Sequence, residues 1–354
     1  MWSGLIISVN FLAAALVAPV WGSLADRYGK RIMIARSGFG MAVTFMLFVL
    51  ASNQWQLLFY RVLNGLMAGF IPASIMLLVS MTPQENMRYT LGVFNTFVAI
   101  GSILGPFFGG ALVQYLGIRP AIMVAVGFIF TGAMLSYFGT KENIIRTNTN
   151  TSILEDIGLV LKIRALRVYF FAVVTLQITN FMLVPTLPLR VAELSKNNTD
   201  MLTGILFSVI GVSMAIGSAQ LFKIKKFNNG TILLLSLLIC GVFNAAQGFT
   251  SSLLLLILIR FLFGFVYAGV NVTGNVLITL NSAEDMRGRA FGVLNSLTSF
   301  GAVIGPLLGG FMGEKLGYAS AFHGSALFFF AAAAVVWHYQ SSIRKVGENR
   351  GTTA

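Results

Sequence analysis

The sequence predicts an all-α membrane protein made of two pseudo-symmetric helical bundles. Hydrophobic residues make up 56% of the chain and charged residues only 10%. The apolar residues also fall into segments long enough to cross a bilayer, and the second half repeats motifs of the first. A soluble domain carries about 25% charged residues, so this chain lacks the side chains for a solvated surface. Lipid must therefore cover its outer face.

We expect eleven membrane-spanning helices, because each span needs about 20 mostly apolar residues. Most spans are separated by short polar or turn-forming segments, but 140–166 is longer, mixes charges and is predicted to be a linker. The predicted organisation is a five-helix bundle (1–139), the linker, a six-helix bundle (167–340) and a tail (341–354). The spans are 2–24, 32–51, 55–80, 91–116, 119–139, 167–188, 202–222, 230–249, 253–279, 289–312 and 318–339.

The net charge of +13 is a topology signal. Of the 24 lysines and arginines, 18 lie in one alternating set of loops and adjoining span ends, and 4 lie in the opposite set. Cytoplasmic loops carry such an excess. The linker and the C-terminus are therefore predicted to be cytoplasmic, and no nucleic-acid partner is expected.

No pattern of catalytic or metal-binding residues is present. The single Cys240 lies in an apolar run, and all eleven acidic residues can be placed in loops or at helix ends. Phosphate-binding loops, metal-ligand clusters and nucleophile–base pairs are absent from the sequence. We therefore expect neither an enzyme nor a bound cofactor or metal.

An internal repeat relates the two halves. Arg61 and Gly65 match Arg260 and Gly264 at an offset of 199, and the segments 85–110 and 284–310 match at 199 and then 200. Parallel repeats of this kind build transporters from two bundles. Shifting the span 167–188 back by the same offset places its counterpart before residue 1. The repeat therefore predicts that the first helix of the first bundle is missing.

The segment Gly22-Ser-Leu-Ala-Asp-Arg-Tyr-Gly-Lys-Arg31 lies between the first two spans. It resembles the loop 2–3 signature of the major facilitator superfamily. Glycine permits a sharp turn, and a carboxylate can accept hydrogen bonds from helix N-termini. The resemblance implies a cytoplasmic latch between the halves; an ordinary positively charged loop is the alternative. The latch residues are Gly22, Asp26, Arg27, Gly29, Lys30 and Arg31.

A glycine stripe at 101–110 resembles the motif that marks antiporters in this superfamily. Spacing of four places the glycines on one helix face, where another helix can approach closely. The resemblance implies a leak-tight pivot between the halves and favours export, whereas a plain packing face is the alternative. The pivot residues are Gly101, Gly105, Pro106, Gly109 and Gly110, with Gly301, Gly305 and Pro306 in the repeated copy.

The segment Arg61-x-x-Asn64-Gly65 lies inside a predicted span and resembles the fourth-helix motif of the superfamily. The resemblance assigns Arg61, with Asp26, to proton coupling; snorkelling to the outer interface is the alternative. Polar residues on inward faces predict a substrate cavity, although each side chain could instead hydrogen-bond between helices. The cavity residues are Asn64, Gln177, Asn180, Tyr267, Asn271 and Asn275.

The resemblance covers nearly the whole chain and points to the twelve-helix drug:proton antiporter branch, in particular bacterial multidrug exporters of the cell (inner) membrane. It implies proton-coupled efflux of small amphipathic substrates by a monomer that alternates its access. Two alternatives remain open. The chain can take up a sugar, metabolite or siderophore by symport or facilitated transport, or it can be a truncated membrane protein that does not transport.

Overall fold

The computed structural model describes the backbone of residues 1–140, 153–221 and 227–351. Side chains are described over the same ranges except at Asp26, Arg88, 153–156, Asp285 and 343–351. The described residues form helices and no strand, which confirms the predicted all-α class.

Eleven segments of the described chain are long and apolar enough to cross a membrane. Five of these segments precede α7 and six follow it. The chain divides into two compact units. The N-terminal unit holds Trp2–Asn150 with Asn198–Ser208, and the C-terminal unit holds Met1, Thr151–Asn197 and Val209–Ala354.

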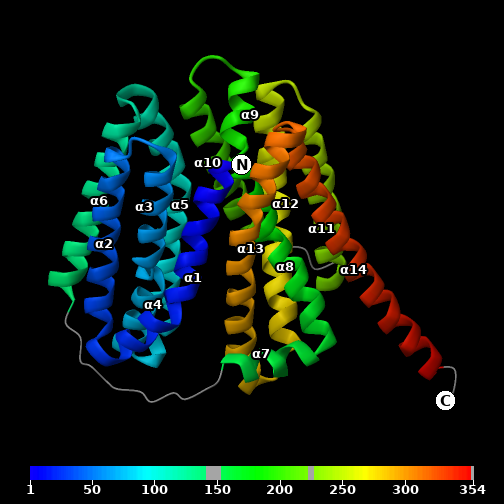
Figure 1. Cartoon of the computed structure of the whole chain (residues 1–354). Coiled ribbons are helices and arrows are strands. Elements are labelled where there is room, and N and C mark those ends of the chain that lie inside the picture. The colour runs from blue at the N-terminus through cyan, green and yellow to red at the C-terminus, as the bar shows by residue number, and fades with distance from the viewer. Residues whose placement is uncertain (141–152, 222–226, 352–354) are drawn as a thin grey trace. The chain divides into compact units, whose positions relative to one another are not determined.

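Within the N-terminal unit the long helices run side by side (Figure 1). In chain order they are α1 (Trp2–Tyr28), α2 (Lys30–Leu50), α3 (Gln54–Leu66), α4 (Phe70–Met81), η1 (Gln84–Asn86), α5 (Met87–Leu116) and α6 (Ile118–Gly139).

The later helices begin with α7 (Ile153–Lys162), which lies inside the predicted linker, and α8 (Arg164–Leu183), which starts three residues before the predicted bundle. The others are α9 (Leu187–Leu194), α10 (Thr199–Leu221), α11 (Asn229–Phe249), α12 (Leu253–Leu280), η2 (Glu284–Met286), α13 (Arg287–Leu316) and α14 (Ser320–Gly351). Helix α14 extends through most of the predicted tail.

The internal repeat is visible in the helix boundaries. Helices α2 and α11 are both 21 residues long and are offset by 199 residues. The pair α3–α4 and the single helix α12 are offset by the same 199 residues, and α5 and α13, both 30 residues long, by 200. The two copies of the repeated sequence pattern therefore form helices of matching length and position.

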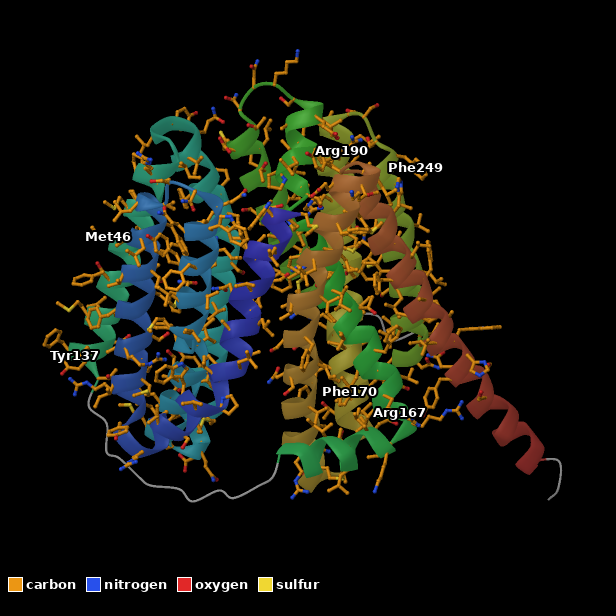
Figure 2. All side chains as sticks on the ribbon, viewed as in Figure 1. Met46, Tyr137, Arg167, Phe170, Arg190 and Phe249 are labelled. Carbon is orange, nitrogen blue, oxygen red and sulfur yellow. The ribbon has the colours of Figure 1, made fainter. Side chains whose placement is uncertain are left out.

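The sides of both units are covered by carbon-rich side chains (Figure 2). Met46 on α2 is 49% exposed and Phe249 at the end of α11 is 79% exposed. Large exposed apolar residues along so many helices are incompatible with a water-covered surface and fit one that faces lipid.

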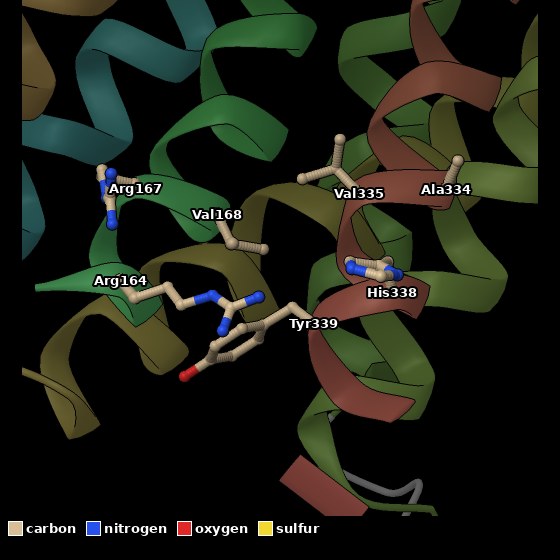
Figure 3. Close-up of a pocket in the computed structure, with 7 residues that line it drawn as sticks. All are labelled: Arg164, Arg167, Val168, Ala334, Val335, His338 and Tyr339. Atoms are coloured by element: carbon tan, nitrogen blue, oxygen red, sulfur yellow. The ribbon is translucent and has the colours of Figure 1, made fainter. Parts of the chain in front are cut away.

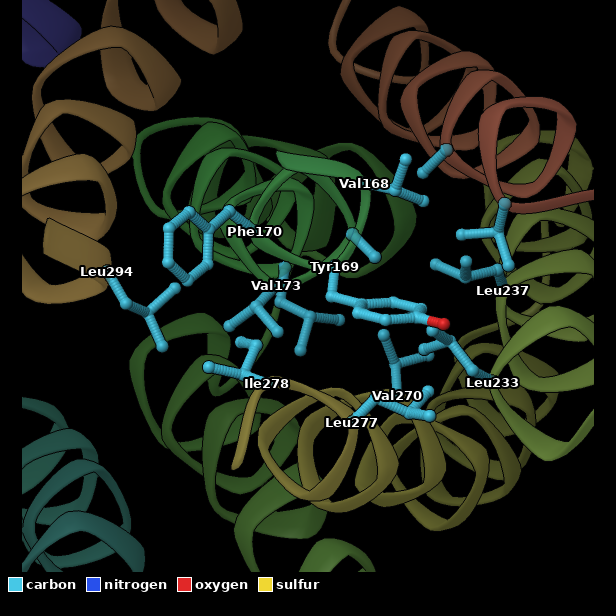
Figure 4. Packing of buried hydrophobic residues seen from close by; sticks show 14 of the residues in the cluster. Val168, Tyr169, Phe170, Val173, Leu233, Leu237, Val270, Leu277, Ile278 and Leu294 are labelled. Carbon is cyan, nitrogen blue, oxygen red and sulfur yellow. The ribbon is translucent and has the colours of Figure 1, made fainter. Parts of the chain in front are cut away.

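The larger buried core lies in the C-terminal unit (Figure 4). Side chains of α8, including Phe170 and Val173, pack against Ile278 on α12 and Leu294 on α13. A smaller core in the N-terminal unit joins α1, α2 and α4 around Ile34 and Leu77. Each unit thus has a core of its own.

Candidate functional site

The predicted latch segment, residues 22–31, is helical except at Gly29, so the expected loop is a turn of one residue. Helix α1 ends at Tyr28 and α2 begins at Lys30, with Gly29 between them at φ +99°. A side chain is strained at this angle, and the Gly29 amide still donates to the carbonyl of Ala25 at 3.0 Å. Glycine at this position is therefore what lets the two helices follow each other without a longer loop.

Two latch arginines contact aromatic rings inside the N-terminal unit. The Nε of Arg31 donates to the backbone oxygen of Tyr137 at 2.6 Å, and its guanidinium lies 4.8 Å from the centre of that ring. Arg27 lies 5.3 Å from the ring of Tyr28. Arg31 thus fastens the start of α2 to the end of α6. The side chain of Asp26 lies outside the described residues, and a Cβ at Gly22 would meet no described atom within 4 Å, so the latch stays a prediction.

Arg61 on α3 points to α2, where its guanidinium lies 4.8 Å from the centre of the Phe48 ring. This distance is within the range of a cation–π contact. The Nε of Arg61 is buried and finds no hydrogen-bond partner among the described residues. The contact with Phe48 holds the Arg61 guanidinium against α2.

Asn64, one turn after Arg61, is buried at the contact of three helices. Its Oδ1 accepts from Asn10 Nδ2 on α1 at 2.9 Å, and its Nδ2 donates to Thr44 Oγ1 on α2 at 2.8 Å. Asn10 also donates to the carbonyl of Arg61 at 3.1 Å. Asn64 is predicted from the sequence to line a substrate cavity, with hydrogen bonding between helices as the alternative. Its contacts are those of the alternative.

The span predicted at 55–80 is present, but its helix is broken between α3 and α4. Gly69 at the break has φ +123°. Pro72, four residues after Ala68, has no N–H to donate to the Ala68 carbonyl, so a regular helix cannot continue here. The repeat supports this cause, since the corresponding position of the unbroken α12 is Asn271.

Three consecutive carbonyls at this break each accept a side-chain hydrogen bond from another helix. Leu66 O accepts from Trp21 Nε1 at 2.8 Å, Met67 O from Ser37 Oγ at 2.7 Å, and Ala68 O from an Arg36 Nη at 3.1 Å.

The Arg36 guanidinium also stacks 3.5 Å from the centre of the Trp21 ring. In the sequence Arg36 is one of the 18 basic residues of the cytoplasmic set, and no motif marks Trp21 or Ser37. Pro72 within a predicted span was the signal that carbonyls would need such partners.

The counterpart of Arg61 in the C-terminal unit is Arg260 on α12, which is 1% exposed. Its Nη1 donates to Gln247 Oε1 at 3.0 Å. Gln247 stands 199 residues after Phe48, the ring on which Arg61 stacks. Each unit therefore holds an arginine against the same position of the neighbouring helix: the half-buried Arg61 stacks on Phe48, and the buried Arg260 hydrogen-bonds Gln247.

The other predicted cavity residues lie in the C-terminal unit on α8 and α12. Tyr267 is buried, and its hydroxyl donates to the carbonyl of Leu176 at 3.2 Å, so it joins these two helices. Asn275 donates to Asn271 Oδ1 at 3.2 Å on the same helix. Gln177 is partly buried and Asn180 is exposed. The four amide side chains therefore keep polar groups on partly open helix faces.

The two glycine stripes have different surroundings. In the C-terminal unit a Cβ at Gly305 would lie 2.6 Å from the carbonyl of Ile178, and one at Gly301 would lie 3.2 Å from Gln177, both on α8. In the N-terminal unit a Cβ at Gly101 or Gly105 would meet no described atom within 4 Å, and the same holds at Gly109. The C-terminal stripe is thus a packing face within one unit, and the matching face of α5 is open.

The end of the α5 stripe does make one close approach. Gly110 lies against the backbone of Asp200 and Gly204 on α10, and the carbonyl of Pro106 lies against Gly204. Ser208 Oγ donates to the carbonyl of Ile103 at 2.6 Å. These α10 residues belong to the N-terminal unit. Small residues allow this backbone contact, as expected for helices in lipid. Whether the stripe acts as a pivot stays a prediction.

Among the residues that the structure describes, no group of three or more His, Cys, Asp or Glu side chains could hold a metal ion. The polar groups of both units are instead amides, hydroxyls and arginines arranged between helices. Such an arrangement can bind and release a solute through weak polar contacts.

The sequence and the fold of this chain are similar to those of known transporters. The family model of the Major Facilitator Superfamily matches residues 3–243 and 170–352. The multidrug resistance protein MdtG of Salmonella schwarzengrund (strain CVM19633) is 32% identical over 327 residues, which cover 91% of this chain and 81% of the relative. The same protein of Salmonella newport (strain SL254) matches with the same identity and coverage.

A solved structure of the nucleoside transporter NupG has a TM-score of 0.78 to this chain at 13% identity. The match covers 95% of this chain and 90% of NupG, and at this identity it supports the fold alone. The family model, the curated relatives and the matching solved structure all indicate a membrane transporter, which agrees with the eleven apolar spans. The chain is therefore a multi-pass integral membrane protein and a secondary transporter that belongs to the major facilitator superfamily.

Proposed function

We propose that this chain is a proton-coupled exporter of small amphipathic drugs. The observation that carries the proposal is its 32% identity to multidrug resistance proteins across 91% of its length. It acts as a monomer in the bacterial cell (inner) membrane, with its C-terminus in the cytoplasm as the basic segments favour. The bundles 1–139 and 167–340, joined by the linker 140–166, transport by alternating access, in which the substrate is exposed to one side of the membrane at a time.

Proton coupling is assigned to Asp26 and Arg61. An arginine stays charged in proteins and cannot release a proton, so a carboxyl group has to carry it. Asp26 lies near the end of the first span and is the carboxyl that we assign to this step. Arg61, whose carbonyl accepts from Asn10 on α1, lies about 24 Å along that helix from Asp26, so the two residues act at different depths of the bundle.

Substrate contacts are assigned to Gln177, Asn180, Asn271 and Asn275, whose amides can hydrogen-bond a neutral or cationic solute. Asn64 and Tyr267 support the cavity residues within their own units, because their polar groups join neighbouring helices. The amides orient the solute, and apolar helix faces bind its hydrophobic part.

The direction of transport is tested in proteoliposomes loaded with buffer of one pH and diluted into another, with valinomycin and potassium clamping the membrane potential. The probe is ethidium, a lipophilic cation. Antiport predicts accumulation when the lumen is acidic, because protons leaving the vesicle drive the dye inward. Asp26→Asn should show no accumulation.

Accumulation only when the outside is acidic would contradict export and support uptake by symport. Absence of transport under both gradients, for ethidium and for a panel of sugars and metabolites, would support the alternative of a protein that does not transport. Liposomes without protein control for passive entry of the dye.

A further inference from the structure

A cavity of about 520 Å³ lies between the start of α8 and the end of α14, within the C-terminal unit. Its volume is in the range of small-molecule sites. Figure 3 shows the two helices on either side of it. The cavity is lined by Arg164, Arg167, Val168, Ala334, Val335, His338 and Tyr339.

The lining changes from apolar to basic along the helices. Val168 and Val335 point into the space between α8 and α14 (Figure 3), and Ala334 lies beside Val335. Arg164 stands one turn before Val168, and Tyr339 one turn after Val335, so the polar groups gather at the same end of the cavity. The guanidinium of Arg164 lies 5.9 Å from the centre of the Tyr339 ring.

This polar end coincides with the ends of two membrane spans, which cover Arg164–Leu183 and Ser320–Ser342. Trp337, one residue before His338, is 62% exposed. An exposed tryptophan at a span end is typical of the boundary between lipid and water. The cavity therefore crosses this boundary, with Arg164 and Tyr339 at headgroup depth and Val335 at the depth of the acyl chains. Arg167 lies beside Val168, about one turn deeper than Arg164, and its long side chain can extend towards the headgroups.

The charge of the cavity is positive. Both arginines are exposed, neither forms an ion pair with a described side chain, and no lining residue is acidic. A lipophilic cation would be repelled here, and free phosphate would leave the apolar part of the cavity uncovered. An anionic amphiphile satisfies both parts, and basic pockets between helices on the cytoplasmic side bind anionic lipid headgroups.

We propose that the α8–α14 cavity binds an anionic phospholipid, whose phosphate contacts Arg164 and Arg167 and whose acyl chain lies along Val168, Ala334 and Val335. The proposal uses the predicted topology and does not depend on the direction of transport. Because α14 follows α13 and α8 packs on α13, a lipid at this position would tie two helices that flank the C-terminal core.

The test is native mass spectrometry of the purified full chain with phosphatidylglycerol or phosphatidylcholine. The double variant Arg164→Gln/Arg167→Gln removes both charges. The matched control is Arg287→Gln/Arg289→Gln, which removes two arginines from the same predicted membrane face outside the cavity. Both pairs leave equal net charge.

We expect wild type and control to bind phosphatidylglycerol alike, and the cavity variant to bind it about thirtyfold more weakly. Phosphatidylcholine should bind weakly to all three. Equal affinity of cavity variant and wild type, an equal loss in the control, or equal binding of the two lipids would overturn the proposal.

A second variant separates a phospholipid from a free anion. Ala334→Trp fills the apolar part and should weaken phosphatidylglycerol binding without removing either arginine, while inorganic phosphate at millimolar concentration should not displace the lipid. Displacement by phosphate, or unchanged lipid binding in Ala334→Trp, would assign the cavity to a small anion instead. Unchanged thermal unfolding of all variants in detergent confirms that folding is intact.

Discussion

The two glycine stripes allow one substitution to be compared in two settings. Gly305→Ala places a Cβ 2.6 Å from the carbonyl of Ile178 and 2.9 Å from Phe181 Cβ, whereas Gly105→Ala meets no described atom within 4 Å. Ordinary contact begins at 3.4 Å, so α8 and α13 must separate by about 0.8 Å at Gly305. Overpacking of this kind costs about 1–3 kcal/mol.

Replacing glycine by alanine inside a helix also contributes about 1 kcal/mol of stability through helix propensity. This gain is common to both variants, so it cancels in their difference. Gly105→Ala should therefore raise the free energy of unfolding by up to about 1 kcal/mol, and Gly305→Ala should lie about 1–3 kcal/mol below it.

The measurement is thermal unfolding of the 354-residue chain in mild detergent, followed by tryptophan fluorescence. Adding Gly309→Ala, which places a Cβ against the carbonyl of Met182, should lower the midpoint further than Gly305→Ala alone. Equal midpoints for Gly105→Ala and Gly305→Ala, or a lower midpoint for Gly105→Ala, would refute the assignment of the occupied and open faces.

Other variants test the polar sites. Asp26→Asn and Arg61→Ala should each abolish proton-driven transport with unchanged membrane insertion; wild-type transport in either would remove its coupling role. Arg36→Ala removes the charge-assisted hydrogen bond to the Ala68 carbonyl at the α3–α4 break and should destabilise the protein by about 1.5–3 kcal/mol. Arg36→Lys should recover part of this loss. An unchanged unfolding midpoint in Arg36→Ala would show that this hydrogen bond does not stabilise the break. Gln247→Leu removes one hydrogen-bond acceptor of the buried Arg260 and should cost about 1–3 kcal/mol; a neutral result in the same melt would mean that this acceptor does not stabilise the protein.

The helical bundles could be predicted from local patterns. The length of each apolar run and the matching motifs identify the spans and the repeat, because a helix in lipid satisfies its own backbone and needs about 20 apolar residues. Gly29 could likewise be assigned to a sharp turn, since the need for glycine at positive φ depends on its own backbone.

The cap at the α3–α4 break could not be predicted in this way. Pro72 indicates that the helix can break here, but the side chains that donate hydrogen bonds to the freed carbonyls lie 30 to 45 positions away in sequence. Which side chain hydrogen-bonds these carbonyls depends on how the neighbouring helices pack against the break. The same holds for Asn64, whose partners on α1 and α2 decide that it joins helices.

The sequence by itself determined that the chain spans a membrane, is duplicated and carries the motifs of its superfamily, because hydropathy and spacing are properties of each segment alone. Only the tertiary structure decided that the stripe of Gly301 and Gly305 is filled by α8 while that of Gly101 and Gly105 is open, and that Arg260 meets Gln247 where Arg61 meets Phe48. The reason is physical: the energy of a small or polar residue in a membrane helix is set by the neighbour that faces it.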